Sequence, residues 1–169
     1  SATRIYGAHM DALWGEVLPA PAERVTLLYD GDRIHAGGLT FTALDTPGHA
    51  YHHHTYRLRD YREGELAFTG DAAGVNLPLV DIVDLPAPPP EFHMETWLRT
   101  LDRLDRAGLD IIYPTHFGPV RDVHGHLVAL RGLMVDAVAF VAERRAAGVE
   151  RDALLAEYIA WNRARARAA

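Results

Sequence analysis

Hydrophobic and polar residues follow two different periods along the chain, and the period changes near its middle. Up to about residue 71, short apolar runs alternate with polar positions, as in strands that bury one face. From about residue 93, apolar residues recur every three or four positions, which is the period of helices that bury one stripe. One continuous apolar run, at 109–116, interrupts the helical part. This order predicts an α/β protein with helices layered on a sheet.

The same pattern bounds the individual elements. We expect a first helix over 2–14 and a hairpin whose strands, 24–29 and 33–38, flank Asp-Gly-Asp, because Asp-Gly favours a tight turn. Residues 72–91 are expected to be loop, since their Pro-rich part cannot join a central sheet. The remaining expected elements are strands over 39–44, 53–60, 65–71 and 109–116, a helix over 93–107, and two amphipathic helices on either side of Gly148.

The composition removes most side-chain nucleophiles. The chain has no cysteine, all 17 basic residues are arginine, and the single serine is Ser1 at the terminus. Thiolate and Schiff-base chemistry are therefore excluded, and a Ser-His-Asp triad is not expected. What remains is the chemistry of water activated by carboxylates and by ten histidines.

Length and charge limit the class of protein and its partners. At 169 residues the chain fits one domain, and its net charge of −6 argues against a nucleic-acid partner. No window approaches the ~20 apolar residues of a membrane span, so no membrane partner is expected. The chain opens at Ser1 without an initiator methionine or a signal-like segment. We expect a cytoplasmic protein whose native N-terminus lies outside this sequence.

Three expected strands finish in the same way. The strand before "TPGH" leads to His49, "ELAFTGD" ends at Asp71, and "LDIIYPTH" ends at His116, each with a glycine beside it. Glycine lets the backbone turn sharply there. Functional side chains of layered α/β proteins commonly gather at one edge of the sheet. Two imidazoles and a carboxylate at such an edge are ligands that a zinc or a mixed zinc/iron site uses.

In this order, "TPGH", "FTGDAAG" and "PTHFGP" resemble the later motifs of the metallo-β-lactamase-fold hydrolases, most closely the bacterial glyoxalase-II-like branch. The resemblance covers residues 1–120, and the two tail helices fit the C-terminal extension of that branch. It implies an αββα sandwich with a dinuclear metal centre between its sheets. It also implies that His49 completes the first metal site, Asp71 bridges both metals and His116 completes the second. Two Zn²⁺ ions are then expected, with iron or manganese as alternatives.

One family motif is absent. The signature His-x-His-x-Asp-His does not occur, and the nearest string, "HGHLVA" at 124–129, has Val128 and Ala129 where Asp and His are required. That string also follows the third motif instead of preceding the first, so His124 and His126 are expected at a helix start or on the surface. The chain therefore resembles a second half: residues 1–124 as the C-terminal half of the domain and 125–169 as the helical extension. The first half would lie on another segment or chain, or was lost.

Five further residues are candidates for the surroundings of the site. Asp45, just before "TPGH", could hold the second nitrogen of a ligand histidine, or could cap the turn. His53 and His54 could hold the metal ligands in position or make the entrance of the site polar. The favoured interpretation is that they are ordinary polar residues of a strand. Tyr51 and Phe117 could form part of a substrate wall.

The resemblance implies hydrolysis of an ester, thioester, lactone or amide of a small molecule by a metal-bridging hydroxide, which Asp71 would orient. Two alternatives stay open. The chain could be a catalytically incomplete half that binds metal only with a segment carrying the missing motif. It could also belong to a di-iron enzyme of oxygen or sulfur redox chemistry. A half-domain would expose an apolar sheet face, so a partner segment or a second copy is expected to cover it.

Overall fold

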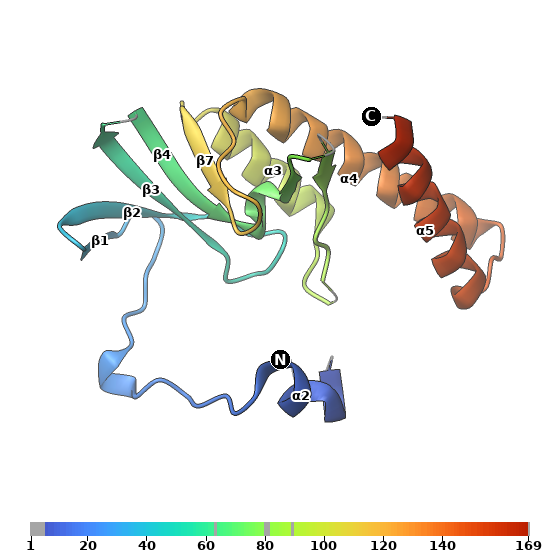
Figure 1. Ribbon diagram of the computed structural model, residues 1–169, viewed down its shortest axis with the longest axis horizontal. Helices are drawn as coiled ribbons and strands as arrows, with labels where there is room; N and C mark the ends of the chain where they lie inside the picture. Colours follow the sequence, from blue (N-terminus) through green and yellow to red (C-terminus); the bar gives the residue numbers. More distant parts are fainter. Residues whose placement is uncertain (1–5, 63, 80–81, 89, 169) are drawn as a thin grey trace.

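The computed structural model describes residues 6–62, 64–79, 82–88 and 90–168. A five-stranded sheet in the order β1-β2-β3-β4-β7 carries helices on one face (Figure 1). Its strands are β1 (Arg33–Ala36), β2 (Leu39–Asp45), β3 (His54–Tyr61), β4 (Gly64–Gly70) and β7 (Ile111–Pro114). The other elements are η1 (Gly7–His9), α2 (Met10–Trp14), η2 (Ala22–Arg24), η3 (Asp71–Ala73), β5 (Val75–Leu77), β6 (Ile82–Asp84), α3 (Met94–Asp105), α4 (Val123–Ala146) and α5 (Arg151–Ala168).

The directions of the strands decide where the chemistry gathers. β2 and β4 each pair with β3 in antiparallel fashion, so they run the same way. β7 pairs with β4 in parallel, with Leu66 opposite Ile111. The C-terminal ends of β2, β4 and β7 therefore lie at one edge of the sheet. This is the arrangement that brings the segments after the three strands together.

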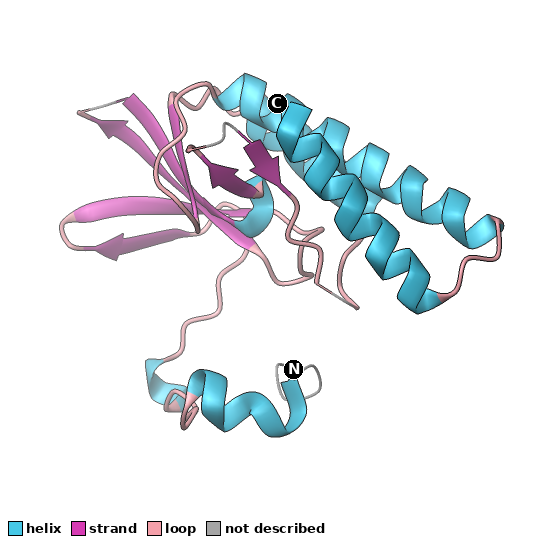
Figure 2. Ribbon diagram, turned by 45° about the vertical axis from the view of Figure 1, so that its right-hand side comes forward, coloured by secondary structure: helices cyan, strands magenta, loops and turns pink. Residues whose placement is uncertain are grey.

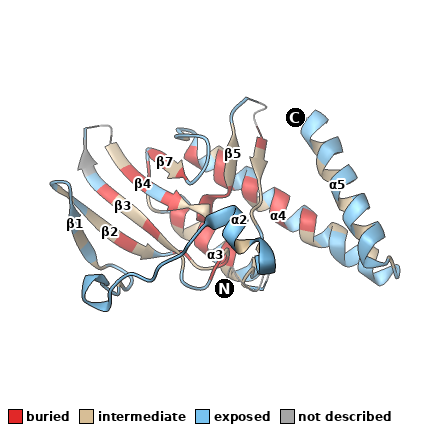
Figure 3. Ribbon diagram, turned by 60° about the horizontal axis from the view of Figure 1, so that its bottom comes forward, coloured by how far each residue is buried: buried red, intermediate tan, exposed pale blue. Residues whose placement is uncertain are grey.

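The core lies between the sheet and helices α3 and α4. Trp97, Leu101 and Leu104 of α3 are fully buried there, and Ala67 and Ile112 contribute from the sheet. Leu127, Leu130 and Met134 of α4 complete the same cluster. Burying each large side chain contributes roughly 1.5–3 kcal/mol, so this layer accounts for much of the stability. Figure 3 shows the buried residues concentrated in these elements, whereas α5 and α2 are mostly exposed.

The opposite face of the sheet is also apolar. Leu58, Leu66 and Ile111 are buried on it, and an aromatic row crosses its surface. The ring of Phe68 lies 6.0 Å from that of Phe41 and is stacked 5.2 Å from that of Tyr113, while Phe68 is 41% exposed. In the described part of the chain no helix packs on this face (Figure 2).

Two sequence predictions fail in the first part of the chain. The hairpin does not form around Asp30-Gly31-Asp32; instead β1 pairs with β2 through Gly37 and Gly38. Both glycines have positive φ, +57° and +77°, which the tight turns favoured in hairpins require. Residues 25–29 form no strand. Of the helix expected over 2–14, residues 7–9 form η1 and 10–14 form α2, and residues 1–5 lie outside the described ranges.

The segment expected as loop contains a small hairpin. β5 and β6 pair with each other in antiparallel fashion, with Asn76 opposite Val83. They form a separate two-stranded sheet beside α4. The Pro-rich residues follow this hairpin, in agreement with the prediction that they stay outside the main sheet. The strands expected over 39–44, 53–60, 65–71 and 109–116 and all three later helices are confirmed within a few residues.

Helices α4 and α5 form an antiparallel pair with Gly148 in the connection (Figure 2). Of the described helices, only α4 has the length and apolar composition that would suffice to cross a membrane, although the sequence predicted no such segment. In its most apolar window, 33% of the residues are buried inside the protein. Leu130 and Met134 pack against α3 and the sheet, so α4 belongs to the same core as residues 1–124.

His126 of α4 ties this helix to the segment that follows β4. Its Nε2 donates to the carbonyl oxygen of Ala73 at 2.7 Å, and the residue is 7% exposed. His126→Ala would leave that carbonyl unpaired beside a cavity. We expect the free energy of unfolding to fall by about 3 kcal/mol. Urea unfolding followed by circular dichroism measures it.

The same residue predicts a pH dependence. Burial lowers the pKa of His126, because the charged ring would lose its hydration. As the pH falls below about 6.5, the unfolded chain therefore takes up this proton before the folded chain does. The contribution of the neutral His126 ring to stability is therefore fully present above that pH and decreases below it. His126→Gln keeps an N–H donor without titrating, so its unfolding free energy should fall less between pH 7.5 and 5.5 than that of the wild type; parallel slopes would contradict this.

Candidate metal site

Three side chains meet at the sheet edge where β2, β4 and β7 end. His49 lies in the turn after β2, Asp71 follows β4 directly, and His116 lies just beyond β7. His49 Nε2 is 3.4 Å from Asp71 Oδ2, and His116 Nε2 is 3.9 Å from Asp71 Oδ1. The structure thus brings together the three residues that the sequence singled out, with one imidazole facing each oxygen of the carboxylate.

A hydrogen bond on the ring nitrogen that points away from Asp71 fixes the orientation of His49. Its Nδ1 lies 2.8 Å from the carbonyl oxygen of Pro86. Because a carbonyl oxygen only accepts, Nδ1 carries the hydrogen and donates it, and the lone pair is on Nε2. That lone pair faces a carboxylate oxygen of Asp71, so a proton or a cation is needed between the two acceptors. A metal-ligating histidine is commonly held in this way by a carbonyl oxygen on its other nitrogen.

Asp71 has a buried oxygen without a donor. Its Oδ1 makes no hydrogen bond within the described part of the chain. A buried carboxylate oxygen without a partner is costly, and a cation at this position would satisfy it. Yet among the described residues no three His, Cys, Asp or Glu side chains are gathered closely enough to hold a metal ion by themselves. The donor set suits a divalent metal but is open, which fits the missing signature motif.

The turn that carries His49 is docked on α3. Thr100 Oγ1 donates to the carbonyl oxygen of Pro47 at 2.7 Å. Gly48 has φ +132°, and a Cβ at this position would lie 2.4 Å from the Cα of Trp97. Only glycine lets the turn approach the helix this closely. The glycine of "TPGH" is therefore needed for the position of the histidine that follows it.

His53 lies beside the cluster instead of on a strand surface. Its Nδ1 is 2.9 Å from Thr46 Oγ1, and its ring centroid is 5.8 Å from that of His49. Because β3 begins only at His54, the alternation of a strand does not decide where His53 points. Burial, and then the neighbouring His49, lower the pKa of His53 to about 4. His53 is therefore a neutral ring at pH 7 that packs against a candidate ligand.

Asp45 contacts His54 and not a candidate ligand. Its Oδ1 lies 2.8 Å from His54 Nε2, and its backbone N–H donates to Asp30 Oδ1 at 2.8 Å. The second nitrogen of His49 is held by Pro86 instead, so Asp45 does not fill the role predicted for it there. Of the two roles predicted for Asp45, the one as partner of His49 is therefore wrong.

The family follows from a comparison with family models. The model described as "Metallo-beta-lactamase superfamily" matches residues 3–116. The chain belongs to the metallo-β-lactamase superfamily. Members of this superfamily generally bind metals on a hydrolase-type fold. No curated protein sequence matches the chain.

Solved structures agree on the fold of this superfamily member. A metallo-beta-lactamase family protein, TTHA1429 from Thermus thermophilus, is 29% identical with a TM-score of 0.52; the match covers 82% of this chain and 50% of that one. The superfamily protein ST1585 from Sulfolobus tokodaii is 20% identical with a TM-score of 0.61, and the match covers 81% of this chain and 48% of that one. A beta-lactamase domain protein from Burkholderia ambifaria is 21% identical with a TM-score of 0.56, and the match covers 81% of this chain and 44% of that one. The chain spans about half the length of these structures.

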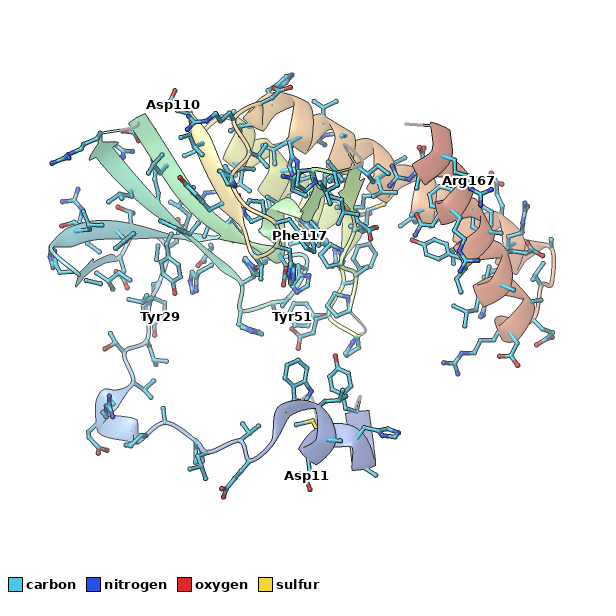
Figure 4. The ribbon with its side chains drawn as sticks, in the orientation of Figure 1. Asp11, Tyr29, Tyr51, Asp110, Phe117 and Arg167 are labelled. Atoms are coloured by element: carbon cyan, nitrogen blue, oxygen red, sulfur yellow. The ribbon has the colours of Figure 1, made fainter. Side chains whose placement is uncertain are left out.

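Two exposed aromatic residues flank this superfamily site. Tyr51 is 69% exposed and Phe117 is 63% exposed, and both lie near the end of the sheet that carries the cluster (Figure 4). Phe117 has φ +67°, which is uncommon for a bulky residue. Such strain tends to occur at functional sites, and here it directly follows His116. The role of both rings as a substrate wall stays a prediction.

The string "HGHLVA" forms the start of α4 and takes no part in the cluster. His124 lies at the surface, with its Nδ1 2.8 Å from Asp105 Oδ1, as the sequence suggested. His126 also lies near the start of α4, which was one of the two predicted positions, but it is buried and bonded to Ala73, so the surface alternative is wrong for it. Both are therefore structural residues of this superfamily member.

Sequence reasoning missed three residues that support the site. Pro86 acts through its carbonyl oxygen, which has no signature in a side-chain pattern. Trp97 packs its ring 5.6 Å from that of His49 and donates Nε1–H to Ala72 at 2.7 Å. Thr46 is fully buried and contacts His53. A threonine ahead of "PGH" is the one feature that could have indicated such support.

Proposed function

We propose that this chain is the second half of a metal-dependent hydrolase of the metallo-β-lactamase fold. It would act on an ester, thioester, lactone or amide of a small molecule. The observation that carries the proposal is the meeting of His49 and His116 on the two oxygens of Asp71, one of them buried without a donor. His49, Asp71 and His116 would hold the metal, with zinc as the expected ion.

A bound divalent metal lowers the pKa of a coordinated water to about 7 and polarises a carbonyl oxygen. The chain's own residues prepare the site for this. Asp71 would supply the negative charge that holds the ion, and the Pro86 carbonyl keeps His49 in the tautomer whose Nε2 can bind it. Without a useful Ser, Cys or Lys, the chain needs no nucleophile other than water.

The remaining ligands would come from a segment with the His-x-His-x-Asp-His motif. The apolar face with Phe41, Phe68 and Tyr113 is the surface on which that segment would pack, since this face has no helix on it in the described residues. The match covers only about half of each similar structure, which supports a further segment about as large as the matched part. Packing there would place the new ligands at the same edge as Asp71.

The experiment compares the chain purified alone with the chain purified together with a segment that bears the motif. Elemental analysis measures bound metal, and hydrolysis is measured on thioester, lactone, ester and amide panels. We expect the chain alone to hold at most weakly bound metal without turnover. Together with the segment it should hold two ions and hydrolyse at least one substrate class.

Each other outcome contradicts a part of the proposal. Turnover by the chain alone would show that the site needs no second segment. Turnover that survives removal of metal by a chelator would refute a metal-dependent hydrolase. Iron as the bound metal, with oxygen consumption and no hydrolysis, would replace the hydrolase with the redox alternative.

A further inference from the structure

A cavity lies away from the metal site, between the β5–β6 hairpin, the start of α4 and the end of α5. Its volume is about 530 Å³, within the range of small-molecule sites. Ile82, Val120 and Ala129 form apolar parts of its wall. None of His49, Asp71 and His116 lines it, so its occupant need not be the hydrolase substrate.

Arg165 of α5 is the cation of this cavity. Its Nη2 donates to the carbonyl oxygen of Val83 at 3.0 Å, which fixes the end of α5 against β6. A guanidinium is always charged and has five N–H donors, and here the donor on Nε is buried without a partner among the described residues. An anionic group would complete it.

The anion of the cavity is Asp122, the N-cap residue of α4. Its Oδ1 accepts the N–H of Gly125 at 3.0 Å and so caps the helix. Asp122 and Arg165 both line the cavity, but they form no ion pair with each other. The other polar side chains of the wall, Asn76 and His126, are uncharged, since the Nε2 of His126 is the donor to Ala73 and its pKa is lowered by burial.

We propose that this cavity binds a free α-amino acid with an apolar side chain. The carboxylate of the ligand pairs with Arg165, its ammonium group pairs with Asp122, and its side chain rests on the apolar wall. A monocarboxylate would meet the like charge of Asp122, and a monoamine would meet that of Arg165. Only a ligand that carries both charges, a zwitterion, pairs with Arg165 and Asp122 together. The apolar wall then favours zwitterions with an apolar side chain.

The test titrates the whole chain with L-leucine and with two analogues of the same carbon skeleton. 4-Methylpentanoate lacks the ammonium group, and 3-methylbutylamine lacks the carboxylate. Binding is followed by isothermal calorimetry and by NMR shifts of the Gly125 and Ala129 amides. We expect saturable binding of leucine, with each analogue at least tenfold weaker. The titration needs neither metal nor turnover, so it is independent of the hydrolase test.

Charge-removing variants locate the two contacts. Arg165→Gln and Asp122→Asn should each weaken leucine binding about tenfold or more. Asparagine caps helices as well as aspartate does, so Asp122→Asn keeps the fold of α4. In this variant the preference for leucine over 4-methylpentanoate should disappear. Arg163→Gln, an exposed arginine on the same helix, serves as the matched control and should leave binding unchanged.

Three results would overturn the proposal. The first is the absence of saturable leucine binding in the millimolar range. The second is equal binding of leucine and 4-methylpentanoate by the wild type. The third is a leucine affinity that Asp122→Asn leaves unchanged while circular dichroism shows that the variant is folded.

Discussion

Gly48→Ala is expected to lower the free energy of unfolding by about 3 kcal/mol and to weaken metal binding in the same variant. A Cβ at this position would lie 2.4 Å from both Cα and Cβ of Trp97, so the turn must move away from α3. Moving the turn also moves His49, which follows it in the chain. Thermal unfolding should show a drop of roughly 10 °C, because 1 kcal/mol corresponds to about 2–4 °C in a chain of this size.

The matched control is Gly38→Ala. Gly38 also has a positive φ, +77°, but no atom lies within 4 Å of its Cβ position. This variant therefore has the backbone strain without the clash, and we expect a loss of about 1 kcal/mol and no change in metal affinity. If the free energy of unfolding falls equally in both variants, the close approach of Gly48 to Trp97 does not contribute to stability.

In the chain purified together with the segment that bears the missing motif, Asp71→Asn should have the largest effect on metal binding. We expect a loss of more than about 100-fold in affinity for Zn²⁺, since even residues that only support metal ligands contribute 10–100-fold. Asparagine keeps the size of the side chain but removes the charge that faces both His49 and His116. Titration with Zn²⁺ against a competing chelator measures the affinity. The metal-free variant should unfold no earlier than the wild type, because the buried Oδ1 has no donor to lose.

Asp105→Asn is the control for this substitution. Asp105 also pairs with a histidine, His124, at 2.8 Å, but at the surface of the helical layer. It should leave zinc affinity unchanged. Unaltered affinity in Asp71→Asn, or equal losses in both variants, would show that the three-residue cluster is not the metal site.

The parts of the fold with strong periodicity were predictable from the sequence. β2, β3, β4, β7 and the three long helices lie where the alternation and the helical spacing of apolar residues predicted them. The meeting of His49, Asp71 and His116 was predicted from the shared way in which three strands end and from the family resemblance. The structure gives the reason, since β2, β4 and β7 run the same way and end at one edge.

Features that depend on pairing between short segments were not predictable. β5 and β6 have three residues each and exist only because they pair with each other. Asp-Gly favours a turn at Gly31, but the strand expected before it does not form, and the hairpin forms instead at the two glycines that follow β1. The environment of His53 depends on where β3 begins, which the run of histidines leaves ambiguous. The Pro86 carbonyl belongs to the backbone, so no residue pattern indicates it.

The parallel pairing of β7 with β4 has a consequence for the order of folding. β1 to β4 form a meander of local hairpins, whereas β7 can join only after α3 has crossed over. Contacts of long sequence separation form slowly, so His116 should reach its neighbours last. A ligand that binds only the assembled cluster then stabilises the native state at this final step by mass action. Zinc should therefore slow unfolding of this chain more than it accelerates refolding.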